Sequence, residues 1–112
     1  MSQDSLGGLQ QLAMLAVLKL GDDAYGATVQ QELEHTAGRS VAISTVYVTM
    51  ERLERKGLVS SYLGEPTPVR GGRAKRRYAL TADGVAALNA SREEMERMWR
   101  AVESTLDPGM LP

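Results

Sequence analysis

The sequence predicts a mostly helical α+β fold, in which three helices precede a two-stranded hairpin and one long helix follows it. Apolar residues recur at helical spacing in four segments of the chain. Two short segments rich in β-forming residues, 59–63 and 75–80, stand together before the last of these helices. The length of 112 residues suits one domain with its own core.

The first helix is expected over residues 6–20, where apolar residues occupy every side. A helix of this kind is buried all round and does not lie on the surface of a monomer. The turn at 21–23, with its two aspartates, is expected to cap a second helix over residues 24–36. Three side chains of that second helix repeat at every fourth position: Tyr25, Val29 and Leu33.

A short β-like entry at 41–43 leads to a third helix, which Ser44 is expected to cap and which ends near Lys56, before Gly57. The predicted core face of this helix carries Val46, Met50 and Leu53. The hairpin follows. Its connection over residues 64–74 is too long for a tight turn, which favours a projecting tip.

Thr81 is expected to cap the last helix, residues 81–107. The apolar positions of this helix follow a heptad pattern, which is typical of a helix that pairs with another helix. These positions are Val85, Leu88, Met95, Trp99, Val102 and Leu106, with Arg92 at the interrupted step. Residues 1–5 and 108–112 are expected to be flexible ends.

This order of elements is that of a winged helix-turn-helix, in which the hairpin forms the wing. Residues 6–80 are therefore predicted to form a DNA-binding domain whose third helix enters the major groove. Residues 81–107 are predicted to form a dimerisation helix, and residues 6–20 are expected to share that interface.

The charge distribution favours a nucleic-acid partner. The net charge of −1 divides into −4 over residues 1–38, +6 over residues 39–80 and −3 over residues 81–112. Five cations and no acid lie within residues 70–77. A basic cluster of this kind is typical of a surface that binds a polyanion, here double-stranded DNA.

The composition argues against several classes of site. Cysteine is absent and histidine occurs once, so the sequence predicts no disulfide, no metal centre, no cofactor and no hydrolytic triad. We therefore expect a protein that is not an enzyme. No apolar run reaches the roughly 18 residues that a membrane span needs, and residues 1–4 lack the basic start of a secretory signal. We expect a cytoplasmic protein without a membrane partner.

Four segments together resemble the PadR family of bacterial transcriptional regulators: Asp23-Ala24-Tyr25-Gly26, Ser44-Thr45-Val46-Tyr47, Leu53–Val59 and Gly72–Gly84. The resemblance covers about residues 6–90. It implies a homodimeric winged-helix repressor that binds a palindromic operator and dimerises through its first and last helices. Larger family members have several helices after the wing, whereas this chain has one and resembles the short subtype.

The residues expected at the dimer interface are Leu9, Leu12, Leu88, Met95, Trp99, Val102 and Leu106. Met95 and Trp99 admit two interpretations. They anchor the dimer as core side chains, or Trp99 and its twofold mate flank a slot for a small aromatic or hydrophobic effector. The resemblance permits such an effector, because short family members use the dimer interface in this way.

On the third helix, burial of one face is expected to leave four side chains facing the bases: Thr45, Val48, Thr49 and Arg52. Threonine hydroxyls and methyl groups can read base edges, and Arg52 can bind guanine or a phosphate. Ser44 at the helix start is a further candidate. Tyr47 either offers its hydroxyl to a phosphate or is a core tyrosine bonded within the protein.

In the wing, Arg73 follows two glycines and is the candidate for the adjacent minor groove. Strand alternation places Lys75 and Arg77 on one face, where we expect them to bind phosphates. The same alternation places Tyr78 on the other face, packed inward. At residue 77 the family commonly has an aromatic, so the arginine adds a charge and alters the packing of the wing.

A second hypothesis keeps the fold and changes the partner. A winged helix can also bind another protein, with its basic wing facing an acidic surface, because a fold does not fix a function. The additional cations at the end of the third helix, Arg52, Arg55 and Lys56, favour nucleic acid.

Overall fold

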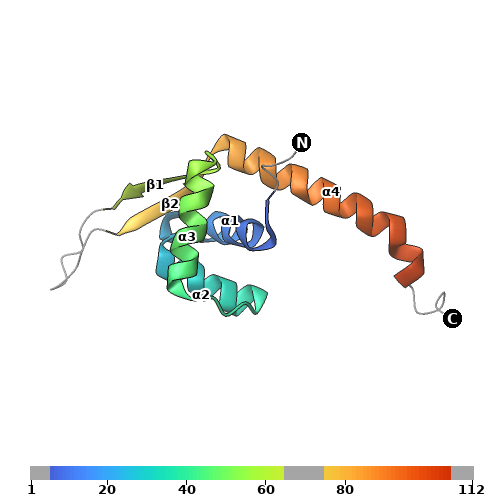
Figure 1. The fold of residues 1–112 in the computed structure, drawn as a ribbon, viewed down its shortest axis with the longest axis horizontal. Helices are drawn as coiled ribbons and strands as arrows, with labels where there is room; N and C mark the ends of the chain where they lie inside the picture. The colour runs from blue at the N-terminus through green and yellow to red at the C-terminus, as the bar shows by residue number, and fades with distance from the viewer. Residues whose placement is uncertain (1–5, 65–74, 107–112) are drawn as a thin grey trace.

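A computed structural model describes residues 6–64 and 75–106 (Figure 1). The elements in order are α1 (Gly8–Leu20), the 3-10 helix η1 (Gly21–Asp23), α2 (Gly26–Ala37), α3 (Ile43–Arg55), β1 (Val59–Leu63), β2 (Arg76–Leu80) and α4 (Ala82–Leu106). The predicted mostly helical α+β fold with a long final helix is confirmed. The two predicted flexible ends and most of the predicted loop between the strands lie outside the described residues.

Helix α1 is the central element and packs against α2, α3, β2 and α4. The largest fully buried side chains come from α1 itself and from α2, α3 and β1: Met14, Val29, Val46, Met50, Leu53 and Val59. The expectation that α1 is buried all round is wrong for a single chain, because Leu15 is 50% and Leu18 is 55% exposed. The core uses the opposite face of α1, and α4 covers these two leucines only in part.

Helix α2 begins two residues later than expected, at Gly26. The reason is that the backbone at Ala24 and Tyr25 is extended and pairs with the wing. The Tyr78 N–H donates to the Ala24 carbonyl at 2.9 Å, and Tyr25 forms an antiparallel bridge with Arg77. The cap is therefore not an aspartate: the Tyr25 N–H donates to Thr28 Oγ1 at 2.8 Å.

The turn between α2 and α3 also differs from the expectation. Residues 41–43 form no strand, and α3 begins at Ile43 with Ala42 as its N-cap, so Ser44 lies inside the first turn instead of capping it. Gly38 ends α2 in the left-handed region, at φ +66°, where glycine carries no steric penalty. Gln30 Nε2 then donates to the Val41 carbonyl at 2.8 Å and holds the turn against α2.

Strands β1 and β2 form an antiparallel pair whose register runs from Val59 opposite Leu80 to Leu63 opposite Arg76. Val59 and Tyr78 are 2% and 5% exposed and belong to the core. The prediction that Tyr78 packs inward is confirmed. Its burial, together with the nearby Tyr47 hydroxyl, raises the pKa of the Tyr78 phenol.

The start of α4 is tightly fixed. Thr81 caps the helix as predicted, because the Gly84 N–H donates to Thr81 Oγ1 at 3.0 Å, while that hydroxyl donates to the Gly57 carbonyl at 2.7 Å. Gly84 is buried, and a Cβ built on it would lie 2.0 Å from the Leu58 carbonyl oxygen. Only glycine therefore allows α4 to lie this close to the residue before β1.

Ala87 and Leu88 still pack against the core, and farther along the chain α4 extends away from the rest of the molecule, opposite the wing (Figure 1). The molecule measures 63 × 30 × 21 Å. We call residues 89–106 the projecting part of α4, and the remaining described residues the body. Within the described ranges, no helix is both long and apolar enough to cross a membrane.

Candidate nucleic-acid interface

The outer face of α3 carries most of the predicted base-reading side chains. Ser44, Thr45, Val48 and Arg52 are all exposed there. Arg52 lies in the last turn, one turn of helix beyond Val48. Side chains in the first turns of a recognition helix are those that reach base edges. The geometry therefore leaves Ser44, Thr45 and Val48 free to contact bases.

Thr49 does not lie on this face, and its predicted placement is wrong. It is 7% exposed, and its hydroxyl donates to the Thr45 carbonyl at 2.7 Å. The reason is helical geometry: Thr49 follows Val46 by three residues and precedes Leu53 by four, so it shares their buried face. A threonine can be buried there because its hydroxyl bonds within the helix.

One exposed residue on the outer face of α3, Glu51, escaped the sequence reasoning. Glu51 lies three positions after Val48, and Arg55 lies four positions after Glu51, so all three share the outer face. A plot of α3 at 100° per residue, with Val46 and Leu53 at the middle of the buried face, would have placed Glu51 on the outer face. Glu51 brings a carboxylate to this face, which can accept a hydrogen bond from a base amino group.

Tyr47 is 48% exposed, so it is the expected half-buried side chain and not a core tyrosine. Its ring lies over the start of α2: a Cβ built on Gly26 would come within 2.4 Å of Tyr47 Cε1 and 2.8 Å of the Tyr47 hydroxyl. Gly26 therefore lets α3 pack closely on α2. One edge of the tyrosine remains in solvent beside the first turn of α3.

Arg77 of β2 lies between two tyrosines. We call this part of the wing, residues 61–62 of β1 and residues 75–77, the wing root. Arg77 Nη2 donates to the Tyr25 hydroxyl at 3.0 Å and its Nη1 to the Tyr62 hydroxyl at 3.3 Å. These two hydrogen bonds, that with Tyr25 first, raise the pKa of the guanidinium further above its ordinary value. Lys75 is exposed beside them, with Nζ 5.4 Å from the centroid of the Tyr25 ring. Arg73, the predicted minor-groove contact, lies outside the described residues.

The other face of the wing root carries a chain of polar contacts. Arg76 Nη1 donates to Ser61 Oγ at 2.9 Å, and that hydroxyl donates to a Glu54 carboxylate oxygen at 2.9 Å. The chain links β2 to the end of α3 through β1. Arg76 also lines a pocket with Tyr47, Glu51 and Glu54, so its positive charge lies beside α3.

The predicted dimerisation residues fall into two groups. Leu9, Leu12 and Leu88 are partly buried against the core of their own chain, whereas Met95, Trp99 and Val102 are exposed on the projecting part of α4. The predicted Leu106 side chain lies outside the part of the chain whose side chains are described. The sequence reasoning did not single out Leu15 and Leu18.

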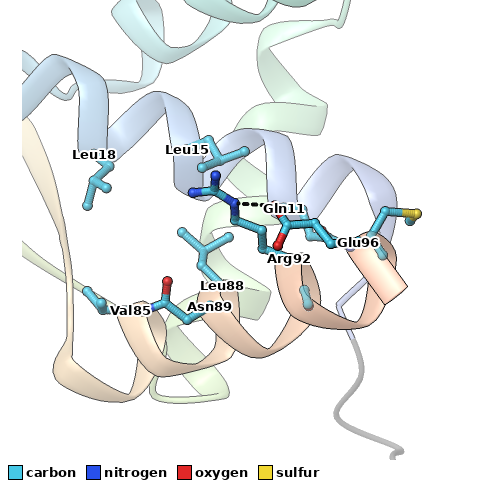
Figure 2. Close-up of a pocket in the computed structure, with 10 residues that line it drawn as sticks. Gln11, Leu15, Leu18, Val85, Leu88, Asn89, Arg92 and Glu96 are labelled. Carbon is cyan, nitrogen blue, oxygen red and sulfur yellow. Dashed lines mark hydrogen bonds and ion pairs between the residues drawn. The ribbon is translucent and has the colours of Figure 1, made fainter. Parts of the chain in front are cut away.

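Those two leucines line a groove of about 360 Å³ between α1 and α4. Figure 2 shows Leu15 and Leu18 of α1 facing Val85 and Leu88 of α4, with the ion pair of Arg92 and Glu96 at one end. Met95 also lines the groove and connects it to the apolar face of the projecting part. Among the described residues no three histidine, aspartate or glutamate side chains gather as metal ligands.

Comparison with known proteins identifies the family. Residues 14–90 match the model of the transcriptional regulator PadR-like family. The transcriptional regulator Rv3488 of Mycobacterium tuberculosis is 38% identical over 81 residues, which are 72% of this chain and 71% of that protein.

Two solved structures show the same fold. A PadR family transcription regulator from Clostridium difficile R20291 superposes with a TM-score of 0.70 at 24% identity, over 88% of this chain and 99% of that chain. BpsR of Bordetella bronchiseptica, whose DNA binding is regulated by 6-hydroxynicotinic acid, superposes with a TM-score of 0.65 at 22% identity, over 98% of this chain and 74% of that chain. The family consists of DNA-binding transcriptional regulators and not of enzymes, and the chain described here belongs to the PadR-like family of transcriptional regulators.

Proposed function

We propose that the chain acts as a homodimeric repressor that binds a palindromic operator and is released by a small aromatic or hydrophobic effector. The observation that carries the proposal is the apolar face of the projecting part of α4. Four side chains lie together there, each between 39% and 63% exposed, and line a shallow groove of about 330 Å³: Met95, Met98, Trp99 and Val102. Methionine and tryptophan are enriched in the cores of protein interfaces.

The pattern of this face favours a second α4 as the partner. The apolar residues of α4 follow heptad positions, which keep one seam of a helix turned toward its neighbour. Arg92 interrupts the seam but forms an ion pair with Glu96 at 3.1 Å, which holds the guanidinium at the edge of the groove. The exposed Leu15 and Leu18 extend the apolar surface onto α1, so that both helices would contribute to one interface.

A twofold pairing through α4 and α1 would place two copies of α3 on one side of the dimer. Related dimers read half-sites separated by about one helical turn, roughly 34–36 Å. Ser44, Thr45 and Val48 would contact base edges, the Tyr47 hydroxyl and Lys75 would contact phosphates, and Arg52 would bind guanine or phosphate. Twofold symmetry of the protein then requires a palindromic operator.

An effector site between the two copies of Trp99 is part of this proposal. The groove beside Trp99 is apolar and shallow in one chain, and a twofold mate would convert it into a slot with aromatic walls. The regulation of BpsR by 6-hydroxynicotinic acid gives an example of a planar effector in a protein of this fold. A ligand that separates or rotates the two α4 helices would change the spacing of the two α3 helices.

The test combines sedimentation with DNA binding by the full-length chain. At micromolar concentration we expect a species of twice the 12.2 kDa chain mass. Selected genomic fragments should contain inverted repeats. If each protomer neutralises three to five phosphates, the slope of log K against log salt should lie between about −5 and −9. A folded monomer that binds no fragment at low salt would overturn the proposal and promote the alternative of an acidic protein partner.

Trp99 is the one tryptophan of the chain, so its fluorescence reports on the proposed slot without interference. We expect titration with planar aromatic acids, 6-hydroxynicotinic acid among them, to quench this fluorescence and to release a labelled operator fragment. Quenching by none of a panel of such compounds would remove the effector from the proposal and leave Trp99 as a dimer anchor.

A further inference from the structure

Tyr25, Arg77 and Tyr62 form one row across the wing root. Arg77 of β2 pairs with Tyr62 of β1 on one side, and with Tyr25 through the antiparallel bridge on the other. Residues directly opposite one another in antiparallel strands place their side chains on the same face. The three side chains therefore stand side by side, on the face opposite the buried Tyr78.

Arg77 is held from both sides of this row. Besides its two hydrogen bonds to the tyrosine hydroxyls, its Cζ lies 5.5 Å from the ring centroid of Tyr25 and 5.7 Å from that of Tyr62. Both distances are within the range of cation–π attraction. Its Nε is buried without a hydrogen-bond partner. Neither ion pair found among the described residues includes Arg77.

These contacts leave the guanidinium poorly placed for a phosphate. An arginine that grips a phosphate uses two parallel N–H groups aimed at the same anion. Here the two terminal nitrogens point to two different hydroxyls on opposite sides, and Nε is covered. Lys75, on the same face, is exposed and has no such hydrogen bonds among the described contacts.

The row instead connects the wing to the recognition helix. Tyr25 immediately precedes α2. The next residue, Gly26, packs against the ring of Tyr47, which belongs to α3. Tyr62 is the last residue but one of β1. Arg77 therefore links β1 to the residue that precedes α2. The contact between Gly26 and Tyr47 extends this link to α3.

We propose that Arg77 is a positioning residue for DNA recognition, which acts through Tyr25 and Tyr62 to fix the wing relative to α3 and does not itself bind a phosphate. This inference rests on the proposed function, because it assumes that the wing and α3 contact the same duplex. It replaces the prediction from strand alternation that Arg77 and Lys75 have the same role.

The first experiment compares Arg77→Met with Lys75→Met in the full-length protein. Affinity for a selected operator fragment is measured by fluorescence anisotropy at several salt concentrations. Loss of one phosphate contact per protomer should flatten the slope of log K against log salt by about 2 for a dimer. We expect this for Lys75→Met. For Arg77→Met we expect about fivefold to twentyfold weaker binding with an unchanged slope.

Coupling supplies the second criterion. If Arg77 acts through the tyrosines, Tyr25→Phe and Arg77→Met remove the same link. The double variant should then bind DNA no more weakly than Arg77→Met alone, and Tyr62→Phe should behave likewise. A flattened salt slope for Arg77→Met, together with additive effects of the tyrosine changes, would overturn the inference and make Arg77 a phosphate ligand.

Two further readouts separate positioning from general loss of structure. The wild type should bind a long duplex more tightly than one trimmed by about four base pairs at each end, where the wing would reach. Arg77→Met should keep its wing contacts but show a smaller preference for the long duplex, because ordering the wing on DNA then costs part of the affinity that those contacts supply. If Arg77→Met lowers the affinity for both duplexes by the same factor, the preference for the long duplex is unchanged and the inference fails.

Hydrogen exchange of the Tyr78 amide, which donates to Ala24, needs no DNA and should be faster in Arg77→Met. Unchanged exchange would contradict the link between wing and α2. If the wild type binds no DNA at all, the proposed function fails, and this exchange rate still decides whether Arg77 holds the wing.

Discussion

The body of the molecule and the projecting part of α4 are both helical, yet they differ in what stabilises them. In the body, α1 has neighbours on several sides and Met14, Met50 and Leu53 are fully buried. In the projecting part, Met95, Met98 and Trp99 are each more than half exposed. Isolated helices of this length are marginal in water. The comparison teaches that contacts within one chain stabilise the body, whereas the apolar face of the projecting part is left uncovered within one chain, which is why we propose a partner for it.

The strongest test of the body is Gly84→Ala, at the point where α4 joins it. The added Cβ would meet the backbone oxygen of Leu58, which cannot rotate away. We expect a loss of about 3 kcal/mol in the free energy of unfolding, from overpacking. Thermal denaturation measures it. The matched control is Gly8→Ala, where the added Cβ meets nothing within 4 Å, and equal losses in the two variants would contradict the packing described here.

The corresponding test of the projecting part is Trp99→Ala. If Trp99 anchors the dimer, each truncation removes an interface side chain of the type that commonly contributes about 2 kcal/mol or more. The dimer dissociation constant should rise at least thirtyfold, as measured by sedimentation, while the secondary structure of the body is retained. Dissociation accompanied by complete unfolding would show that the body is not independent of the dimer, and the comparison would fail.

A pH titration sharpens the account of the body. The pKa of Tyr78 is raised by burial, so the folded state holds the phenolic proton more tightly than the unfolded state. This contribution to stability is complete below the unfolded pKa of about 10, and it is lost as the pH rises through the folded pKa. We expect the wild type to lose more stability than Tyr78→Phe between about pH 9 and 11. Parallel curves in urea denaturation would contradict this.

The smallest expected effect concerns the ion pair of Arg92 and Glu96 in α4. Both side chains are largely exposed, at 77% and 47%, so solvent and salt screen the pair. Glu96→Gln should cost about 0.3 kcal/mol, a shift of roughly 1 °C in melting temperature. Glu93→Gln, which removes the same charge outside the two ion pairs found, is the control. A larger loss for Glu96→Gln would place the pair inside the interface, where it is desolvated.

Much of the fold was predictable because local rules and tertiary contacts agree in most segments. Thr81 caps α4, Tyr78 packs inward, and the heptad residues Met95, Trp99 and Val102 are exposed in one chain. The mistakes have two causes: a contact distant in sequence that overrides a local signal, and a residue of α3 assigned to the wrong helix face. The pairing of Ala24 and Tyr25 with β2 delays the start of α2. Thr49 is buried because its polar group is satisfied within the helix.

The sequence alone determined the order of elements, the basic middle of the chain, the family and the apolar heptad pattern of α4, because these depend on residue type and short spacing. Only the tertiary structure decided that Arg77 lies between Tyr25 and Tyr62 and that Leu15 and Leu18 open toward α4. The contact of Arg77 with Tyr25 and the groove between α1 and α4 each join residues more than 50 positions apart in the chain, and no local periodicity records which strands and helices will meet. The physical reason is that the register of the sheet and the packing of α1 fix those neighbours only once the core has formed.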